Sequence, residues 1–373
     1  MKFRRVIYGM LLMALFSCAK EKGRAVSSPT DGPVPILFQT AVGIEQEERE
    51  DPKSTISAWS GQELMIFGIY RRDGVLDLSP TGRYIDGVFS QAPSGGSGGF
   101  LPPLPNEQTA ESYFYPTTGT LDFFACCLAG VPYPDDLFDT YTVSGRVLHR
   151  ISEKYVNQQD RTLAFPIQVD GTQDVLAAYA DRVADCSRSP IISPDQAYSG
   201  SAARENVYPT LRFFHVLSRL SLKAKAMGPG VRIKDIYIRA RNAAELVVVR
   251  PNPASSPSVE IHPEDVPADL IVETAAPYDS SPLPTDRLRD LGECLIVPGD
   301  SRCIVYFTLK QDGKEGESDS HVTVDMGQYG LTFQSGMWYD INLSIYGPQK
   351  VEMTVTMSPW GTGYGEFDIN PYI

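Results

Sequence analysis

The sequence predicts an all-β protein built from antiparallel β-sandwiches, and three observations support this fold class. Short apolar or alternating runs recur along the chain, and Gly, Pro, Asn, Asp and Ser interrupt them at intervals typical of sandwiches. No segment carries the sustained 3.6-residue periodicity of an amphipathic helix. In the clearest strand, VEMTVTMSPW, every second residue from 351 to 357 is apolar, which indicates one face against a core.

The N-terminus predicts a secretory signal peptide over residues 1–17. Lys2, Arg4 and Arg5 precede an apolar run that is too short to span a bilayer. The following Leu-Phe-Ser-Cys sequence is typical of a bacterial lipobox, so Cys18 is the predicted lipidation site. An ordinary signal peptide with an incidental cysteine is the alternative. Residues 18–32 are polar and suit a lipidated, flexible tether.

Length and charge bound the domain organisation and the partners. The chain has 373 residues and a formal charge of -13, and removal of the three basic leader residues changes this to -16. Such a charge disfavours nucleic acid and anionic lipid headgroups as partners. A chain of this length can bury two cores, so we predict an N-terminal domain over 33–190 and a C-terminal domain over 191–373.

The cysteines do not form a disulfide framework. Five remain besides Cys18, and none belongs to a CxxC pair of the kind that binds metal. If two strands pair about the Pro-Gly turn in CLIVPGDSRC, Cys294 and Cys303 lie opposite each other. They are therefore a candidate disulfide. Free thiols are the alternative, since Pro298 does not fit the tightest hairpin turns.

Catalytic and metal-binding motifs are weak. GGSGG around Ser97 matches the nucleophile-elbow pattern, but it lacks the flanking strand and helix and is better interpreted as a flexible loop. The four histidines have no metal-ligand spacing, and the acidic residues 312–325 lack the oxygen spacing of a calcium loop. No carboxylate pair stands out as a general acid and base. We therefore predict no enzyme, no metal and no cofactor.

The segment LRFFHVLSRLSLKAKA places His215 within an apolar strand. Leu211 and Phe213 share its face, whereas beyond Ser218 the even-numbered positions are apolar, so the register switches near Ser218. A buried imidazole without partners would be costly. We predict that His215 is a structural, partly buried residue with polar partners, in preference to a catalytic or metal-binding one.

Several segments together resemble the fimbrillin family, the lipoprotein-derived pilins of bacterial type V pili and their accessory subunits. In chain order they are WSGQELMIFGIY, YFYPTTGTLDFFACC, QDVLAAYA, LRFFHVLSRLSL and VEMTVTMSPW. No single motif is specific, and Val175 departs from the leucine of the family pattern. Their order covers nearly the whole mature chain. The resemblance implies two tandem transthyretin-like antiparallel β-sandwich domains.

The resemblance also implies a function. Family members are structural or accessory pilus (fimbria) subunits that are exported as lipoproteins to the cell outer membrane and the cell surface and contribute to adhesion. A protease cuts after an arginine, an N-terminal strand leaves, and an extended segment of another subunit fills the groove. The matching cut site here is Arg49, which suits the role better than Arg24, Arg71 or Arg72. The matching displaced strand carries Ile36, Phe38, Thr40 and Val42.

The C-terminal sequence GYGEFDINPYI is the candidate donor strand, because Phe367, Ile369 and Ile373 alternate with polar residues. The implied partners are other pilin subunits, the outer membrane through the lipid, and a host protein or glycan receptor. The alternative function is a lipid-anchored surface β-sandwich that binds glycan through exposed Tyr and Trp side chains.

Overall fold

The computed structural model describes most of the chain after residue 31. The described residues are 32–42, 62–91, 99–100, 113–143, 146–187, 189, 191–251, 258–261, 267–274, 281–299, 303–311, 320–347, 350–360 and 367–368. Contacts divide the chain into two units, Met1–Gly32 and Pro33–Ile373, and every described strand and helix belongs to the second. Within these ranges no helix has the length and apolar character needed to cross a membrane.

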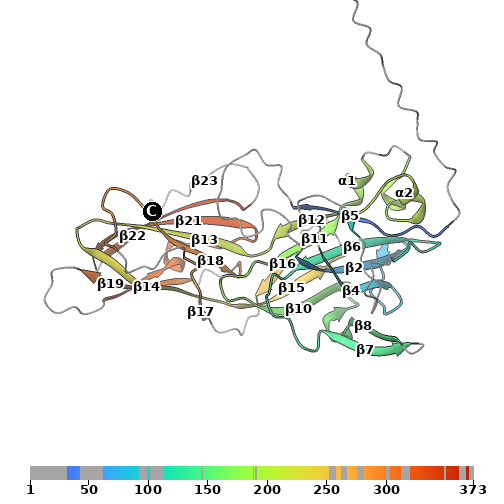
Figure 1. The fold of residues 1–373 in the computed structure, drawn as a ribbon, viewed down its shortest axis with the longest axis horizontal. Helices are drawn as coiled ribbons and strands as arrows, with labels where there is room; N and C mark the ends of the chain where they lie inside the picture. The colour runs from blue at the N-terminus through green and yellow to red at the C-terminus, as the bar shows by residue number, and fades with distance from the viewer. Residues whose placement is uncertain are drawn as a thin grey trace, which may run out of the picture. The chain divides into compact units, whose positions relative to one another are not determined.

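The largest sheet has eight strands, which come from the part of the chain between Phe38 and His215. Its strands are β1 (Phe38–Val42), β2 (Glu63–Arg72), β3 (Val75–Leu76), β4 (Arg83–Gln91), β5 (Gly99–Phe100), β6 (Thr120–Cys127), β11 (Leu176–Ala180) and β12 (Thr210–His215). They are ordered β3-β2-β6-β11-β12-β1-β5, and β4 also pairs with β2 (Figure 1).

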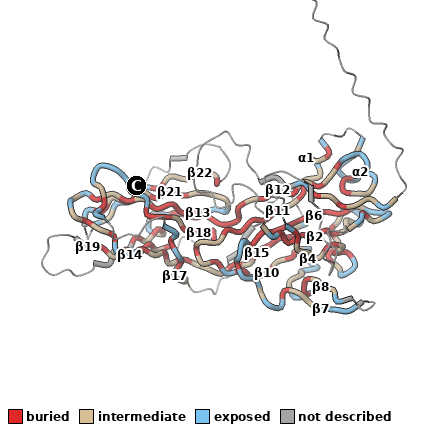
Figure 2. The backbone as a smooth tube through the Cα atoms, in the orientation of Figure 1, coloured by how far each residue is buried: buried red, intermediate tan, exposed pale blue. Residues whose placement is uncertain are grey.

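On β2, β6 and β11 both faces of this sheet are buried, which explains why these strands are apolar runs, whereas buried and part-exposed residues alternate on β4 and β12. On β2, Leu64 and Ile66 point into one core, whereas Met65 and Phe67 point into another. We name these the first core and the second core. In Figure 2 the buried residues, coloured red, lie mainly along the strands of the sheets.

The first core includes Ile36, Phe38, Leu64, Ile66, Tyr115, Leu121, Phe123, Tyr198, Leu211 and Phe213. The second core includes Met65, Phe67, Phe124, Leu163, Phe165, Val216, Leu217, Leu246, Val248, Leu295 and Trp360.

A four-stranded sheet supplies the opposite wall of the second core, because its apolar residues belong to the same cluster. Its strands are β16 (Ser258–Ile261), β15 (Ala243–Val249), β10 (Thr162–Gln168) and β9 (Val156–Asn157), in that order. Because β15 pairs antiparallel with β10, strand pairing crosses the predicted boundary between residues 190 and 191. The division into two domains stays a prediction.

Two further sheets enclose a third core, which includes Leu220, Leu222, Ile236, Ile238, Cys294, Cys303, Phe307, Phe333, Tyr339 and Ile341. One sheet is β18 (Arg289–Ile296), β13 (Ser218–Ala226), β21 (Met337–Gly347), β22 (Lys350–Pro359) and β23 (Phe367–Asp368). The other is β17 (Ala268–Leu270), β14 (Val231–Ala240), β19 (Ile304–Gln311) and β20 (Ser320–Asp325).

The remaining elements are short. They are the hairpin β7 (Phe138–Val143) and β8 (Arg146–Ile151), the helices α1 (Arg182–Cys186) and α2 (Gly200–Arg204), and the 3-10 turns η1 (Glu153–Tyr155), η2 (Pro194–Gln196) and η4 (Met326–Tyr329). Asp181 caps α1 by accepting hydrogen bonds from the backbone N–H groups of Val183 and Ala184. The helices and η2 lie in the connection between β11 and β12.

The all-β fold class is confirmed, and the register switch near Ser218 appears as the break between β12 and β13. Of the strand pairs in the described part of the chain, however, two are parallel: β1 with β12, and β13 with β21. The transthyretin-like detail stays a prediction.

Candidate functional site

The candidate site is the position that β1 occupies beside β12. The strand runs parallel to β12, with Gln39 opposite Thr210 and Val42 opposite Phe213. On its other side β1 pairs antiparallel with the two-residue strand β5. Among the described strands only β5 lies beyond β1, so removal of β1 would uncover the edge of β12.

The side chains of Ile36 and Phe38 hold this segment in the first core. Both are fully buried, and the ring of Phe38 lies edge-on to that of Phe123 with 4.9 Å between ring centroids. Gln39, between them and the end of β1, is exposed. The spacing of Ile36 and Phe38 therefore places two apolar anchors on one face, as the sequence predicts for this strand.

Backbone hydrogen bonds fix the segment before β1 as well. The Ile36 N–H donates to the carbonyl of Tyr113 at 2.8 Å, and the Tyr115 N–H donates to the carbonyl of Val34 at 2.8 Å. The Gln39 N–H donates to the carbonyl of Pro209 at 3.0 Å. We call the space that β1 and the segment before it fill the groove. It is lined by β12 on one side and by residues 113–115 with β5 on the other.

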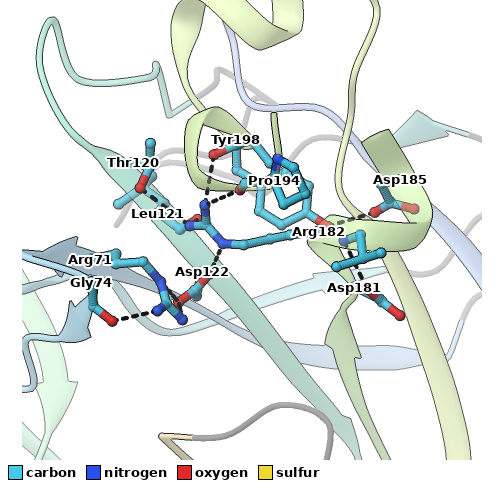
Figure 3. Close-up of polar contacts among 12 residues, drawn as sticks. Arg71, Gly74, Thr120, Leu121, Asp122, Asp181, Arg182, Asp185, Pro194 and Tyr198 are labelled. Atoms are coloured by element: carbon cyan, nitrogen blue, oxygen red, sulfur yellow. Dashed lines mark hydrogen bonds and ion pairs between the residues drawn. The ribbon is translucent and has the colours of Figure 1, made fainter. Parts of the chain in front are cut away.

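A buried polar cluster supports the sheet where β11 and β12 connect (Figure 3). Asp122, on β6, is 3% exposed and accepts hydrogen bonds from Arg71 at 2.8 Å and from Arg182. Arg182 also donates to the carbonyl of Leu121 at 2.6 Å and to that of Pro194 at 3.0 Å. Its guanidinium lies 5.2 Å from the ring centroid of Tyr198, so Arg182 ties α1 and η2 to β6.

Asp185 extends this cluster to the first residues of β12. Its carboxylate accepts hydrogen bonds from the Tyr198 hydroxyl at 2.7 Å, the Thr210 backbone N–H at 2.7 Å and Arg212 at 2.9 Å. Burial, together with Asp185, raises the pKa of Tyr198 far above its usual range, so the hydroxyl stays protonated and donates. Thr210 is the partner of Gln39, and Asp185 therefore positions the edge strand of the groove.

His215, at the end of β12, has the polar partner that the sequence predicts. It is 8% exposed, and its Nδ1 lies 2.8 Å from Oδ2 of the buried Asp174. Its ring stacks on Trp360 with centroids 3.7 Å apart and planes 15° apart. Among the described residues, no group of three His, Cys, Asp or Glu side chains could hold a metal ion. These contacts are those of a structural histidine.

The beginning of the C-terminal tail lies on the edge of its own sheet. Strand β23 pairs antiparallel with β22, with Asp368 opposite Thr356 and Phe367 opposite Met357. These two residue pairs are the whole of the pairing that the structure describes for the tail, because Ile369 and Ile373 lie outside the described residues.

Several predicted site residues cannot be placed. Cys18 and Arg49 lie outside the described residues, and for Thr40 and Val42 the structure describes only the backbone within β1. The predicted roles of Cys18 in lipidation and of Arg49 in processing stay predictions.

The predicted hairpin around Pro298-Gly299 is wrong. Strand β18 carries Cys294 and belongs to one sheet of the third core, whereas β19, which follows Cys303, belongs to the other sheet. Both cysteines are buried free thiols, and burial raises the pKa of Cys303 to about 12. Symmetric strand pairing therefore gives no support to a bridge between Cys294 and Cys303.

Sequence reasoning missed two parts of the site. Residues 113–115 and β5 line one side of the groove. The sequence did not indicate β5, because this strand is only two residues long and lies at the end of a glycine-rich stretch. The cluster around Arg182 was missed as well. Asp122, a lone carboxylate inside the apolar run LDFFACC, was the available signal, because a charge at such a position needs a buried partner.

No protein-family model matches the chain, and no curated protein matches it. Among solved structures, a putative cell adhesion protein from Bacteroides uniformis is similar at 16% identity and a TM-score of 0.47, covering 89% of this chain and 100% of that one. The fimbrial anchor protein Mfa2 from Porphyromonas gingivalis is similar at 11% identity and a TM-score of 0.31, covering 88% of this chain and 98% of that one.

The tip fimbrial protein Mfa3 from Porphyromonas gingivalis, with a C-terminal truncation, is similar at 11% identity and a TM-score of 0.36, covering 88% of this chain and 100% of that one. Each of the three structures is thus matched over nearly the whole of its own length.

Proposed function

We propose that this chain is a structural or accessory pilus subunit that assembles by protease-triggered donor-strand exchange and contributes to adhesion. The observation that carries the proposal is the position of β1 next to β5, the outermost described strand of its sheet. Two fully buried anchors hold it there: Phe38 in the strand and Ile36 just before it. Residues 43–62, which contain Arg49, connect β1 to β2, so a cut there separates β1 from the rest of the chain.

The energetics explain why a cut is needed. Burial of Ile36 and Phe38 contributes roughly 1.5–3 kcal/mol each, and the three backbone hydrogen bonds contribute about 1 kcal/mol each. A strand that is covalently tethered beside its groove has a high effective concentration and outcompetes a tail that arrives from solution. Once the tether is cut, β1 is diluted when it dissociates, and the tail of another subunit takes its place.

The tail suits the donor role because its described part lies at the edge of its sheet. Only two residue pairs join β23 to β22 within the described residues. Its apolar residues alternate with polar ones, so one face can enter the first core while the other stays in water.

The donor role is tested with two matched tail variants of the full mature chain. Phe367→Ala with Ile369→Ala removes two of the three predicted anchors and leaves Ile373, and Glu366→Ala with Asp368→Ala changes the neighbouring polar residues. We expect folded monomers of the first variant that do not elongate after protease treatment, and normal ladders from the second. Fibres of normal length from the anchor variant would contradict the donor role.

The processing site is tested by Arg49→Ala, with Arg24→Ala as the control. The cell-surface species should keep its N-terminus and stay unpolymerised in the first variant only, as read by mass spectrometry. The same measurement on Cys18→Ser reports whether the chain is lipidated at Cys18, which would anchor it in the outer membrane before processing.

The two tryptophans within the described residues give the glycan-binding alternative little support. The indole of Trp338 lies under the Arg219 guanidinium at 4.4 Å, and that of Trp360 is stacked on His215. Both rings are thus occupied by neighbouring side chains. Glycan binding by a variant that cannot polymerise would instead support a receptor-binding role.

A further inference from the structure

Residues 113–115, which line the groove on the side opposite β12, would keep part of their support after β1 leaves. The hydrogen bonds that join them to Val34 and Ile36 would be lost with the removed segment. The contacts that Tyr84 and Phe123 make with them come from β4 and β6 and would stay. This side of the groove therefore does not depend on β1 alone.

Tyr84 contacts these residues from β4. Its hydroxyl donates a hydrogen bond to the carbonyl of Phe114 at 2.7 Å. Its ring lies edge-on to that of Tyr113, with 5.8 Å between centroids, and edge-on to that of Tyr70 on β2, with 5.6 Å between centroids. Burial raises the pKa of Tyr84, so its hydroxyl stays protonated at neutral pH and donates.

Tyr115 supports the same residues through its ring and not through its hydroxyl. The residue is 6% exposed, and its ring centroid lies 6.4 Å from that of Phe123 in the first core. Its hydroxyl is buried and has no hydrogen-bond partner within the described part of the chain. Tyr84 and Tyr115 therefore form a matched pair in which one hydroxyl bonds the backbone of the groove and the other does not.

The remaining sides of the groove differ in how far they depend on β1. The backbone N–H of Thr210 on β12 is held by the carboxylate of Asp185, a contact in which β1 takes no part. Strand β5, in contrast, pairs with no described strand except β1. Two sides of the groove thus have support of their own, and β5 loses its strand partner when β1 leaves.

We propose that Tyr84 is a positioning residue that keeps residues 113–115 in place in the emptied groove, so that an incoming strand meets a surface that is already formed. In the occupied groove the hydrogen bonds to Val34 and Ile36 share this role. In the emptied groove it is left to Tyr84 and to the ring of Tyr115. The inference rests on the proposed loss of β1 and adds the residue that prepares the groove for the next strand.

The proposal has a kinetic consequence. A groove that is correctly formed only part of the time binds a strand with an affinity reduced by that fraction. Once a strand is bound, its own hydrogen bonds hold residues 113–115, as those of β1 do in the structure. Loss of the Tyr84 hydroxyl should therefore slow the binding of a strand and leave its release almost unchanged.

The test follows β1 as it rebinds to its own groove. The mature chain, made without the leader, carries a fluorophore on Cys18 and a site-specific protease sequence inserted after Arg49. The cysteines of the described residues are buried, so they do not take up the label. After the cut, fluorescence anisotropy is followed on dilution, at concentrations where no elongation is observed. It gives the dissociation constant and the release rate of the labelled fragment, and from these the binding rate.

Tyr84→Phe keeps the ring and removes the hydroxyl. We expect the binding rate of the fragment to fall about fivefold, as loss of one hydrogen bond allows, and the release rate to stay within twofold. Tyr115→Phe, which removes the hydroxyl without a described partner, is the matched control and should leave both rates within twofold. Equal changes in the two variants, or a change in the release rate alone, would overturn the role of Tyr84.

The measurement separates this inference from the donor role of the tail, because the labelled strand is β1 itself. Slower binding in Tyr84→Phe would support the role of Tyr84 even if the tail proved not to be the donor. A labelled fragment that leaves neither variant nor the natural protein after the cut would contradict the loss of β1, and the inference would fall with it.

Discussion

At the scale of single residues, the surroundings of a side chain determine its contribution to stability more than its residue type does. Phe38 lies in a strand that the proposed function removes, yet it is as fully buried as any core residue. Asp86 carries a charge where burial opposes it. Each makes a measurable contribution to the free energy of unfolding.

Phe38→Ala should lower the free energy of unfolding of the uncut protein by about 3–4 kcal/mol, because it removes a buried ring and leaves a cavity beside Phe123. The measurement is equilibrium urea unfolding. Gln39→Ala, an exposed neighbour on the same strand, should change stability by about 0.5 kcal/mol or less. Equal effects of the two variants would show that β1 is not packed as described.

Protonation of Asp86 should raise the free energy of unfolding at pH 5 relative to pH 7. Burial is the main cause that raises the pKa of Asp86 from 3.8 to about 6, despite its 2.9 Å hydrogen bond from Arg83. The folded state therefore binds a proton at pH 5 that the unfolded state does not bind, and stability from this group rises as pH falls from 7 to 5.

The difference in free energy of unfolding between the natural protein and Asp86→Asn should thus move by about 1 kcal/mol in favour of the natural protein between pH 7 and pH 5. Urea unfolding of both proteins at the two pH values measures it. A constant difference would mean that Asp86 does not take up a proton in this range.

At the scale of elements, the connection between β11 and β12 acts as a brace for the groove. Its two helices have five residues each, too short to be stable alone, and Arg182 and Asp185 tie α1 to the sheet. The brace contacts β12 at Thr210, where β1 also pairs.

Asp185→Ala should loosen this brace and lower stability by about 2 kcal/mol, since three hydrogen bonds end on its carboxylate. Amide hydrogen exchange of Thr210 and its strand neighbours should become faster, which a purely global loss of stability would not confine to β12. Asp195→Ala, at an exposed position of the same connection, is the control. Uniform exchange across all sheets would contradict the local role.

The sequence was sufficient to predict strands but not their partners. Apolar runs and turn residues identify β2, β6, β12 and β22, and alternation identifies the buried face of β1. Partners were harder to predict because β1 pairs with a strand about 170 positions later in the chain. The hairpin predicted for Cys294 and Cys303 was wrong because β18 and β19, the strands on either side of the turn, belong to different sheets of the third core.

At the scale of the whole molecule, one chain segment links the three cores. Strands β12 and β13 follow each other almost without interruption, and their residues enter the first core at Leu211, the second at Leu217 and the third at Leu222. His215 lies where the segment passes between cores, and its contacts with Asp174 and Trp360 join residues distant in sequence.

His215→Ala should therefore lower the free energy of unfolding by about 3 kcal/mol, because it leaves the buried Asp174 carboxylate without its partner and removes the stacking on Trp360. His149→Ala, at an exposed position of β8, should change it by about 0.5 kcal/mol or less. Thermal unfolding compares the two. Unchanged stability with lost binding to another molecule would assign His215 a functional role.

The stacking of Trp360 on His215 has a mechanical consequence. Trp360 is the last described residue before β23, where the tail begins, and the groove that would receive the next tail is lined by the strand that ends at His215. If subunits are joined as proposed, tension along the fibre is applied to β12 by the tail in the groove and to the residues after Trp360 by the next subunit. The stacking of His215 on Trp360 joins these two points within one body, so it would carry part of the load.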